Sequence, residues 1–409
     1  MRFPEFQNAP AWKPVSLRKA SVPVDKPVGE RKLTPVSISA GIGFVPQAEK
    51  FGRDISGGQY QRYTLVRDGD FVFNKGNSLK FPQGCVYLLQ YWGEAAAPNV
   101  FIAFRLKDGY ANGFFQNCFE LNQHGKQLQR HITSGARSNG LLNISKETFF
   151  NVEIPTPSLP EQQKIAECLD SVDALIAAQG RKLEALRTHK KGLMQQLFPQ
   201  EGETQPRLRF AEFEGAGQWE VRTIGEMFSL INGCAFKPED WQPSGTPIIR
   251  IQNLNDPSAE FNYSQKPVPE RNRVEPGDLL FAWSGTLGSS FGARIWNGPS
   301  GVLNQHIFKV LMDEQKVKLQ FALLVLTRVE EEIARRTHGF KASFVHVKKS
   351  DLVKIEMLLP SPCEQQRIAE CLASLDELIS AEVQKLDTLK THKKGLMQQL
   401  FPRLRELNA

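Results

Sequence analysis

Two segments of the chain place apolar residues at alternating steps of four and three. In each segment, Ile165–Leu197 and Ile368–Leu400, eight of ten such positions are aliphatic. This is the heptad pattern of a coiled coil, and ordinary core helices rarely hold it for about five heptads. Pro160 precedes the first seam residue, and Pro199 and Pro402 follow the segment ends. The pattern predicts two long helices that pair through an apolar seam.

The two helical segments are copies of one sequence. Residues 157–199 and 360–402 agree at 30 of 43 positions, and the stretches Thr188–Pro199 and Thr391–Pro402 are identical. An RF-x-EF motif followed by a tryptophan opens each half, at residues 2–12 and 209–219. Between these markers the halves barely match. A repeat of this length is far too long for a solenoid unit, so we predict two tandem halves whose helices stayed alike while their globular parts diverged.

These boundaries predict an α+β fold in which two mixed globular domains are joined by an antiparallel coiled coil with pseudo-twofold symmetry. The expected parts are a first domain (1–156), a first helix (157–199), a linker (200–206), a second domain (207–359), a second helix (360–403) and a C-terminal tail (404–409).

Polar residues interrupt the seam near its middle. Antiparallel pairing would bring Gln179 near Glu382, where a buried polar layer fixes the register of a coiled coil. The same register would place two seam lysines beside acidic residues of the other helix, Lys190 beside Glu370 and Lys393 beside Glu167.

The globular parts mix short β-type runs with turns. Strands are expected at residues 71–73, 86–92, 100–106, 247–254, 279–283 and 306–312, and a helix at 315–337.

Each half also carries two loops of small, polar and basic residues, one after a shared Gly-Asp motif and one before the helical repeat. Such side chains suit hydrogen bonds to phosphates and base edges, although plain strand-connecting turns would look similar. The candidate DNA-contacting residues are Asn74, Lys75, Asn77, Arg137, Ser138, Ser284, Thr286, Arg335, Arg336, His338, Lys341 and Ser343. For Trp283 and Trp296 we favour core packing over base contact.

Charge is distributed unevenly between the halves. The chain carries a net charge of +7, and residues 1–156 alone hold 19 basic and 12 acidic residues. Residues 200–359 hold 19 and 20, so the second domain would need its basic residues on one face. Six cysteines without a CxxC pair, no apolar leader and no apolar run long enough to span a membrane predict a cytoplasmic protein.

Motifs for several kinds of chemistry are missing from the sequence. It contains no GxxxxGK[ST] phosphate loop, no strand followed by GxGxxG, no HExxH and no histidine spacing typical of metal ligands. We therefore expect a binding and scaffolding protein that is not itself an enzyme and binds no cofactor or metal.

The repeated EQQ-[KR]-IAE-C-L helix starts, the THKKGLMQQLFP ends and the RF-x-EF…W openings resemble those of the specificity subunit of type I restriction–modification systems. The resemblance implies two target-recognition domains, each reading one half of a split sequence in double-stranded DNA, and a coiled coil that sets the spacing. It also implies two modification subunits that bring the methyl donor, and restriction subunits that bring ATP, Mg²⁺ and cleavage.

Near-identical helices would offer equivalent docking surfaces to two copies of one partner. The candidate docking residues are His189, Lys190, Lys191, His392, Lys393 and Lys394. Two alternatives stay open at this point: a coiled-coil adaptor that dimerises without binding DNA, and a nuclease with unrecognised carboxylate and lysine ligands.

Overall fold

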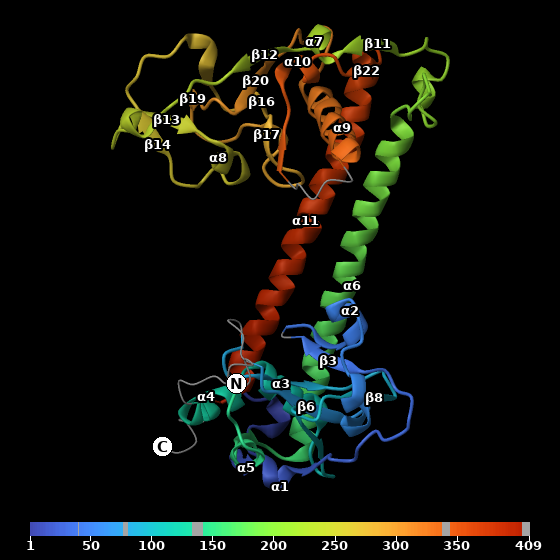
Figure 1. Cartoon of the computed structure of the whole chain (residues 1–409), viewed down its shortest axis with the longest axis vertical. Helices are drawn as coiled ribbons and strands as arrows, with labels where there is room; N and C mark the ends of the chain where they lie inside the picture. The colour runs from blue at the N-terminus through green and yellow to red at the C-terminus, as the bar shows by residue number, and fades with distance from the viewer. Residues whose placement is uncertain (40, 77–80, 133–141, 338–343, 403–409) are drawn as a thin grey trace. The chain divides into compact units, whose positions relative to one another are not determined.

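The computed structural model describes residues 1–39, 41–76, 81–132, 142–337 and 344–402. The chain forms two compact units (Figure 1): unit 1 comprises Met1–Arg181 and Val383–Ala409, and unit 2 comprises Lys182–Glu382. Two helices of 39 residues, α6 (Leu159–Leu197) and α11 (Pro362–Leu400), each contribute one end to unit 1 and the other to unit 2. The predicted α+β fold, with two mixed domains joined by two long helices, is confirmed.

Unit 1 is built on a four-stranded antiparallel sheet in the order β2-β9-β6-β7, with three two-stranded sheets, β1-β10, β3-β4 and β5-β8, beside it. Its strands are β1 (Lys13–Ser16), β2 (Ser21–Pro23), β3 (Val36–Ser39), β4 (Gly43–Pro46), β5 (Thr64–Arg67), β6 (Asp70–Asn74), β7 (Cys85–Leu88), β8 (Glu94–Ala97), β9 (Ile102–Leu106) and β10 (Glu153–Thr156). Its other helices are α1 (Leu17–Ala20), α2 (Gln47–Phe51), α3 (Asn112–Glu120), α4 (Gln123–Leu128) and α5 (Lys146–Phe150), with 3-10 turns at Pro4–Phe6, Gly57–Arg62 and Gln129–His131.

Unit 2 is built on an equivalent four-stranded antiparallel sheet, β12-β20-β16-β18, and has a second sheet in the order β14-β13-β19-β15. Its strands are β11 (Glu220–Thr223), β12 (Ser229–Asn232), β13 (Thr246–Ile249), β14 (Asn262–Ser264), β15 (Arg273–Val274), β16 (Leu279–Ala282), β17 (Ser284–Thr286), β18 (Gly292–Ile295), β19 (Gly301–Leu303), β20 (Ile307–Leu311), β21 (Phe344–His346) and β22 (Glu356–Leu359). Its other helices are α7 (Ile224–Met227), α8 (Ile251–Asn255), α9 (Leu319–Thr337) and α10 (Lys349–Leu352), with 3-10 turns at Ala211–Phe213, Pro238–Asp240 and Glu270–Asn272.

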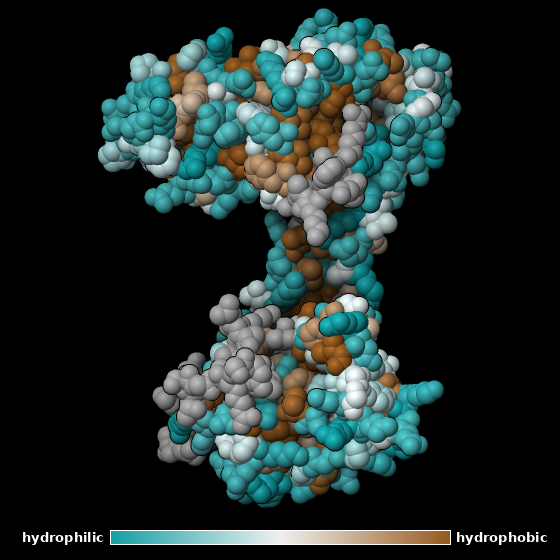
Figure 2. Space-filling model, in the orientation of Figure 1, coloured by the Kyte–Doolittle hydropathy of each residue, from teal (hydrophilic) through white to brown (hydrophobic). Residues whose placement is uncertain are grey.

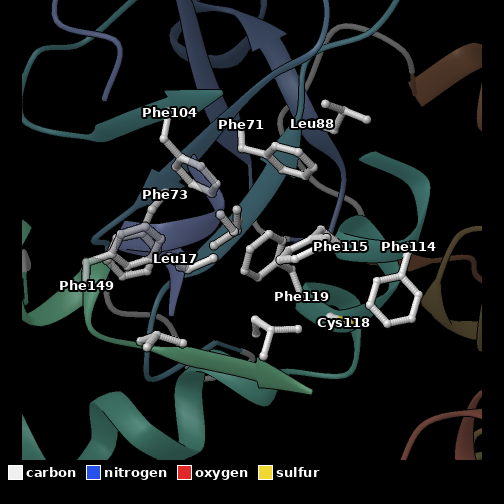
Figure 3. Packing of buried hydrophobic residues seen from close by; sticks show 14 of the residues in the cluster. Leu17, Phe71, Phe73, Leu88, Phe104, Phe114, Phe115, Cys118, Phe119 and Phe149 are labelled. Carbon is white, nitrogen blue, oxygen red and sulfur yellow. The ribbon is translucent and has the colours of Figure 1, made fainter. Parts of the chain in front are cut away.

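The central strand of each main sheet is covered on both faces. In β6, Phe71 and Phe73 point into the core that includes α3, and Val72 points into a separate cluster on the other face. Successive side chains of a strand point to opposite faces of the sheet. Because both faces of this strand are covered by a hydrophobic cluster, the run is apolar throughout. Figure 3 shows Phe71 beside Phe104, with which it stacks, and Phe73 beside Phe149 of α5. Phe71 and Phe104 both meet Phe119 of α3 edge to face. In unit 2, β16 divides its residues between two clusters in the same way.

Three predicted elements differ from the structure. The run 247–254 is a strand only to Ile249, because the side chain of Asn253 accepts a hydrogen bond from the backbone N–H of Arg250 (3.1 Å) and begins helix α8. The run 86–92 ends as a strand at Leu88, because the Asp68 carboxylate binds two backbone N–H groups of the following turn (3.0 Å each). The helix predicted from residue 315 begins at Leu319, and α3 was not predicted from the sequence.

Hydrophobic and hydrophilic residues are unevenly distributed over the surface. In the view of Figure 2 most of the surface is hydrophilic, and hydrophobic residues gather over the part of unit 2 that holds β17 and α9. Within the described part of the chain, no helix is both long and apolar enough to cross a membrane.

Candidate nucleic-acid interface

The start of each long helix is fastened to its own unit by a buried glutamate. In unit 2, Glu364 accepts two hydrogen bonds from the guanidinium of Arg209 (2.7 Å each) and one from the indole of Trp219 (3.3 Å). In unit 1, Glu161 makes the same contacts with an arginine and a tryptophan: Arg2 (2.7 and 2.8 Å) and Trp12 (3.1 Å). Both glutamates are 1% exposed. These contacts join the RF-x-EF…W openings to the EQQ motifs, and we call them the glutamate latches.

The next glutamine of each EQQ motif orients a second segment. The side chain of Gln162 accepts from the backbone N–H of Ala111 (2.9 Å), just before α3, and donates to the carbonyl of Pro157 (3.0 Å). Gln365 repeats this in unit 2 with Lys318, just before α9 (2.9 Å), and with the carbonyl of Pro360 (2.9 Å). The EQQ motif therefore positions the helix that covers each main sheet.

A phenylalanine that follows the last residue of each long helix is buried in the core of the unit to which that helix end belongs. In unit 1, Phe401 at the end of α11 lies 5.3 Å from the ring of Phe114 and 6.2 Å from that of Trp12. In unit 2, Phe198 at the end of α6 stacks on Phe321 at 5.5 Å and lies 6.0 Å from Trp219. Much of the repeated LFP sequence is thus explained by packing within the chain.

The seam is buried as predicted. In both helices each of the ten seam positions is buried or half-buried, and the polar seam residues Gln179 and Glu382 are each 7% exposed. Within unit 2, Glu382 forms an ion pair with Lys182 of the other helix. The placement of Gln179 beside Glu382 stays a prediction.

The ionic partners across the seam differ from those predicted. In unit 1, Lys393 binds Asp173 (3.0 Å) and Glu120 of α3 (3.1 Å), in place of Glu167. In unit 2, Lys190 binds Asp376, in place of Glu370. Each observed partner on the facing helix lies six positions from the predicted one. The pairing is antiparallel, as predicted, but these two ion pairs are not the predicted ones.

Burial and ion pairing act in opposite directions on one of these lysines. Burial alone would lower the pKa of Lys393, but its contacts with Asp173 and Glu120 outweigh this and raise the pKa. Lys190 and Lys393 therefore help to hold the two helices together. Four other candidate docking residues are exposed: His189, Lys191, His392 and Lys394.

Each of the two identical helix ends also has a set of exposed residues. Thr188, His189, Lys191, Gln195 and Gln196 are exposed, and so are their five equivalents on α11. With about 3.6 residues per helical turn, Thr188, Lys191 and Gln195 lie on the side away from the seam, and His189 and Gln196 flank it. Their identity between the copies is not explained by packing within the chain.

The predicted DNA-contacting residues of unit 1 lie at the end of its central strand. Asn74 ends β6, donates to the carbonyl of Ile38 (3.0 Å) and accepts from the backbone of Gly76 (2.7 Å). Lys75 is half-buried beside the carbonyl of Ile144. Asn77, Arg137 and Ser138 lie outside the described residues.

The predicted residues of unit 2 are spread over three elements. Ser284 on β17 is 6% exposed, whereas Thr286 on the same strand is half-buried. Arg335 on α9 is exposed and forms an ion pair with Glu332. The side chain of Arg336, and residues His338, Lys341 and Ser343, lie outside the described structure.

In each half, a residue that follows the second candidate loop bonds to the residue that follows the central strand. In unit 1, the backbone N–H of Leu142 donates to the carbonyl of Lys75 (2.8 Å). In unit 2, that of Val347 donates to the carbonyl of Trp283 (3.0 Å), while β17 pairs with β21. Lys75 and Trp283 therefore occupy equivalent positions after the central strand. We call these positions, with the neighbouring turns, the strand-end edges.

Two sets of residues escaped the sequence reasoning. The glutamate latches could have been found, because the motifs at both of their ends were recognised as repeats. The turn Asn304–His306, which lies beside Trp283, carried no repeat or motif. Among the residues that the structure describes, no group of three or more metal-ligating side chains comes together.

Comparisons with known proteins agree with this geometry. A family model described as the type I restriction modification DNA specificity domain matches residues 56–188 and 217–391. The chain is 25% identical over 301 residues to the type I restriction enzyme MjaVIII specificity subunit of Methanocaldococcus jannaschii, covering 69% of this chain and 70% of that protein. It is 27% identical over 293 residues to the putative type I restriction enzyme MjaX specificity subunit of the same organism, covering 69% and 66%.

Two solved structures share the fold. One, on complex assembly and conformational transition of the type I R-M system, has a TM-score of 0.60 at 17% identity and covers 96% of this chain and 98% of that chain. The other, a type I restriction–modification S subunit from M. genitalium, has a TM-score of 0.54 at 16% identity over 97% of each chain.

Proposed function

The chain belongs to the type I restriction–modification DNA specificity family, and we propose that each of its two units reads one half of a split target in double-stranded DNA. The observation that supports this proposal is that the two units share one scaffold but differ in the side chains at their strand-end edges. The main sheets, the latches and the helix docking are repeated, whereas the strand-end edge carries Lys75 in unit 1 and Trp283 in unit 2. Equivalent frames with different side chains at the edge suit two readers of different base sequences.

The paired helices set the distance between the two half-sites. α6 and α11 each run for 39 residues without a break. Removing one heptad from each helix would shorten the coil by about 10 Å, which is about three base pairs of B-DNA. The spacer between the half-sites should then shorten by about that amount while both half-sites keep their sequences. A changed half-site with an unchanged spacer would contradict this role of the coil.

The outward faces of the identical helix ends dock two copies of one modification subunit, which brings the methyl donor. Restriction subunits, with ATP and Mg²⁺, join through that assembly. Of the docking residues predicted from the sequence, the exposed ones, His189 with Lys191 and His392 with Lys394, form this surface, and Lys190 and Lys393 support it from the seam.

Native mass spectrometry of the purified complex tests the docking surface. A charge-reversing pair, His189→Glu with Lys191→Glu, should remove one modification subunit, and the same pair in α11 should remove the other. Arg187→Glu is the matched control, because Arg187 is exposed on the same helix but is replaced by lysine in the second copy. Full retention of both subunits in the combined variant would refute the docking surface.

The direct test of the whole proposal is methylation mapping of DNA from cells that express this chain with its modification subunit. Two short defined blocks around an unspecified spacer are expected. A continuous motif would mean that one unit alone reads DNA. No sequence-specific methylation by an assembled complex would refute the proposal.

A further inference from the structure

The strand-end edge of unit 2 gathers the ends of several strands around one turn. The turn Asn304–His306, between β19 and β20, receives the neighbouring strands through backbone hydrogen bonds. The N–H of Asn304 donates to Ile249 at the end of β13 (3.0 Å), and the N–H of Trp283, after β16, donates to His306 (3.2 Å). This part of the unit is therefore held rigidly by two sheets at once.

Trp283 is the centre of an aromatic cluster at this edge. Its ring stacks at 5.8 Å and 27° on Phe308, which is 2% exposed and belongs to the core. The imidazole of His306 lies 5.3 Å from the indole, and that of His346 on β21 lies 4.7 Å from it in an edge-to-face arrangement. The indole therefore packs on the core through Phe308 and contacts two histidines, His306 before β20 and His346 on β21.

The polar groups of this cluster are incompletely satisfied. The amide nitrogen of Gln305 lies 3.2 Å from Nε2 of His306. An amide nitrogen can only donate, so Nε2 accepts and the ring proton is on Nδ1. Nδ1 of His306 and Nε1 of Trp283 are both buried, and neither has a hydrogen-bond partner among the described residues. Since these two atoms are buried, the polar groups that this cluster offers to a ligand are those of the exposed residues Gln305 and His346.

The chemistry of the accessible groups indicates what that ligand is. Gln305 and His346 are exposed beside the half-buried His306. Amide and imidazole groups without a carboxylate suit neutral hydrogen-bonding edges, and a glutamine side chain matches the paired acceptor and donor, N7 and N6, of adenine in the major groove. The imidazole N–H of His346 matches the N7 acceptor of either purine.

We propose that Gln305 and His346 read purine edges in the half-site recognised by unit 2, with Gln305 assigned to adenine and with Trp283 and His306 holding these two side chains in place. This assignment rests on the proposed function of the two units. It locates the reading chemistry of unit 2 on residues other than Ser284, which is only 6% exposed. Unit 1 has Lys75 where unit 2 has Trp283, so the equivalent edge there has different chemistry.

The experiment compares Gln305→Ala and His346→Ala, singly and together, with the matched control Gln315→Ala. Gln315 is an exposed glutamine of the same unit, and it follows β20 whereas Gln305 precedes that strand. Each chain is produced with its modification subunit, and the methylated motif is mapped. Each of the two edge variants should relax one or two base pairs of one half-site by roughly 5- to 150-fold.

The outcomes separate this inference from the proposed function. The other half-site and the spacer should stay unchanged in every edge variant, and Gln315→Ala should keep the complete motif. A double variant that keeps both half-sites at full stringency would overturn the inference and leave the two-reader function intact. If the unaltered chain directs no split motif, the proposed function itself fails. Circular dichroism and subunit assembly show whether the variants fold, and His346→Gln, which retains a donor, should restore part of the preference.

Discussion

The glutamate latch of unit 2 allows a quantitative prediction from a nearly isosteric substitution. Glu364→Gln keeps the size of the side chain and removes its charge. In the native unit Glu364 is 1% exposed, and the side chain of its partner Arg209 is 9% exposed. The guanidinium also donates to the carbonyls of Ala216 (2.8 Å) and Gly217 (3.1 Å), so it stays in place when the carboxylate is lost. The substitution therefore leaves a positive charge that is buried without a counter-ion.

Breaking a buried ion pair from one side costs about 3–5 kcal/mol, because the remaining charge cannot recover its hydration. The equivalent latch of unit 1 supplies an internal comparison. Glu161 is equally buried, but the side chain of Arg2 is 24% exposed and can be hydrated in part. Glu161→Gln should therefore cost about 1.5–3 kcal/mol, which is the range for a hydrogen bond to a charged group. The difference between the latches comes from the exposure of the arginine alone, since the bond lengths match.

A chain with two units need not unfold in one step, so the assay should resolve the units. Hydrogen exchange followed by mass spectrometry reports local opening free energies for peptides of each unit. Glu364→Gln should lower the protection of unit 2 more than Glu161→Gln lowers that of unit 1. Adding Arg209→Met to Glu364→Gln should recover much of the loss, because the unpaired charge is then gone. Equal losses in the two units, or additive effects of the Arg209 and Glu364 changes, would refute this reasoning.

Three further predictions test other parts of the structure. Phe401→Ala should destabilise unit 1 by about 3–5 kcal/mol in the same exchange experiment, because it empties an aromatic site in the core. Lys393→Met should couple energetically to Asp173→Asn and act additively with Glu167→Gln, as a double-mutant cycle would show; coupling to Glu167 instead would favour the ion pair predicted from the sequence. Burial lowers the pKa of His124 from 6.5 to about 4. The unfolded chain therefore binds a proton at His124 more readily than the folded chain. The free energy of unfolding should be highest above pH 6.5 and should fall by up to about 3 kcal/mol as the pH drops toward 4. In acid titrations of unfolding, His124→Phe should flatten this pH dependence.

The heptad pattern predicted the long helices well because their seam is set by local periodicity. All twenty seam positions are at least half-buried, and the polar pair was correctly assigned to the seam. The predicted ion-pair partner was wrong by six positions at each lysine. Periodicity fixes which face is buried, but it does not fix which acidic residue a long lysine side chain reaches on the facing helix.

The sequence predicted strands correctly where apolar runs were flanked by turn residues. It predicted the ends of strands wrongly where a side chain redirected the backbone. Asn253 begins a helix within an apolar run, and the carboxylate of Asp68 ends another run by binding two backbone N–H groups. Both are single hydrogen-bonding side chains whose partners depend on the folded geometry. The same reason explains why the turn at Gln305 was not proposed. The turn becomes a candidate site because Trp283 and His346 lie beside it, and these residues are distant from it in the sequence and come together only in the folded unit.

The duplication lets one half serve as a reference for the other. Where the copies agree and the side chain is buried, as at Glu161 and Glu364, agreement is explained by the fold. Where they agree and the side chain is exposed, as at His189 and His392, packing within the chain gives no reason for it, and a partner that binds twice does. Where the frame agrees but the side chain differs, as at Lys75 and Trp283, we assign the difference to the half-site that each unit is proposed to read. Exchanging edge residues between the halves should therefore change target bases without changing assembly, whereas exchanging the helix ends should change neither.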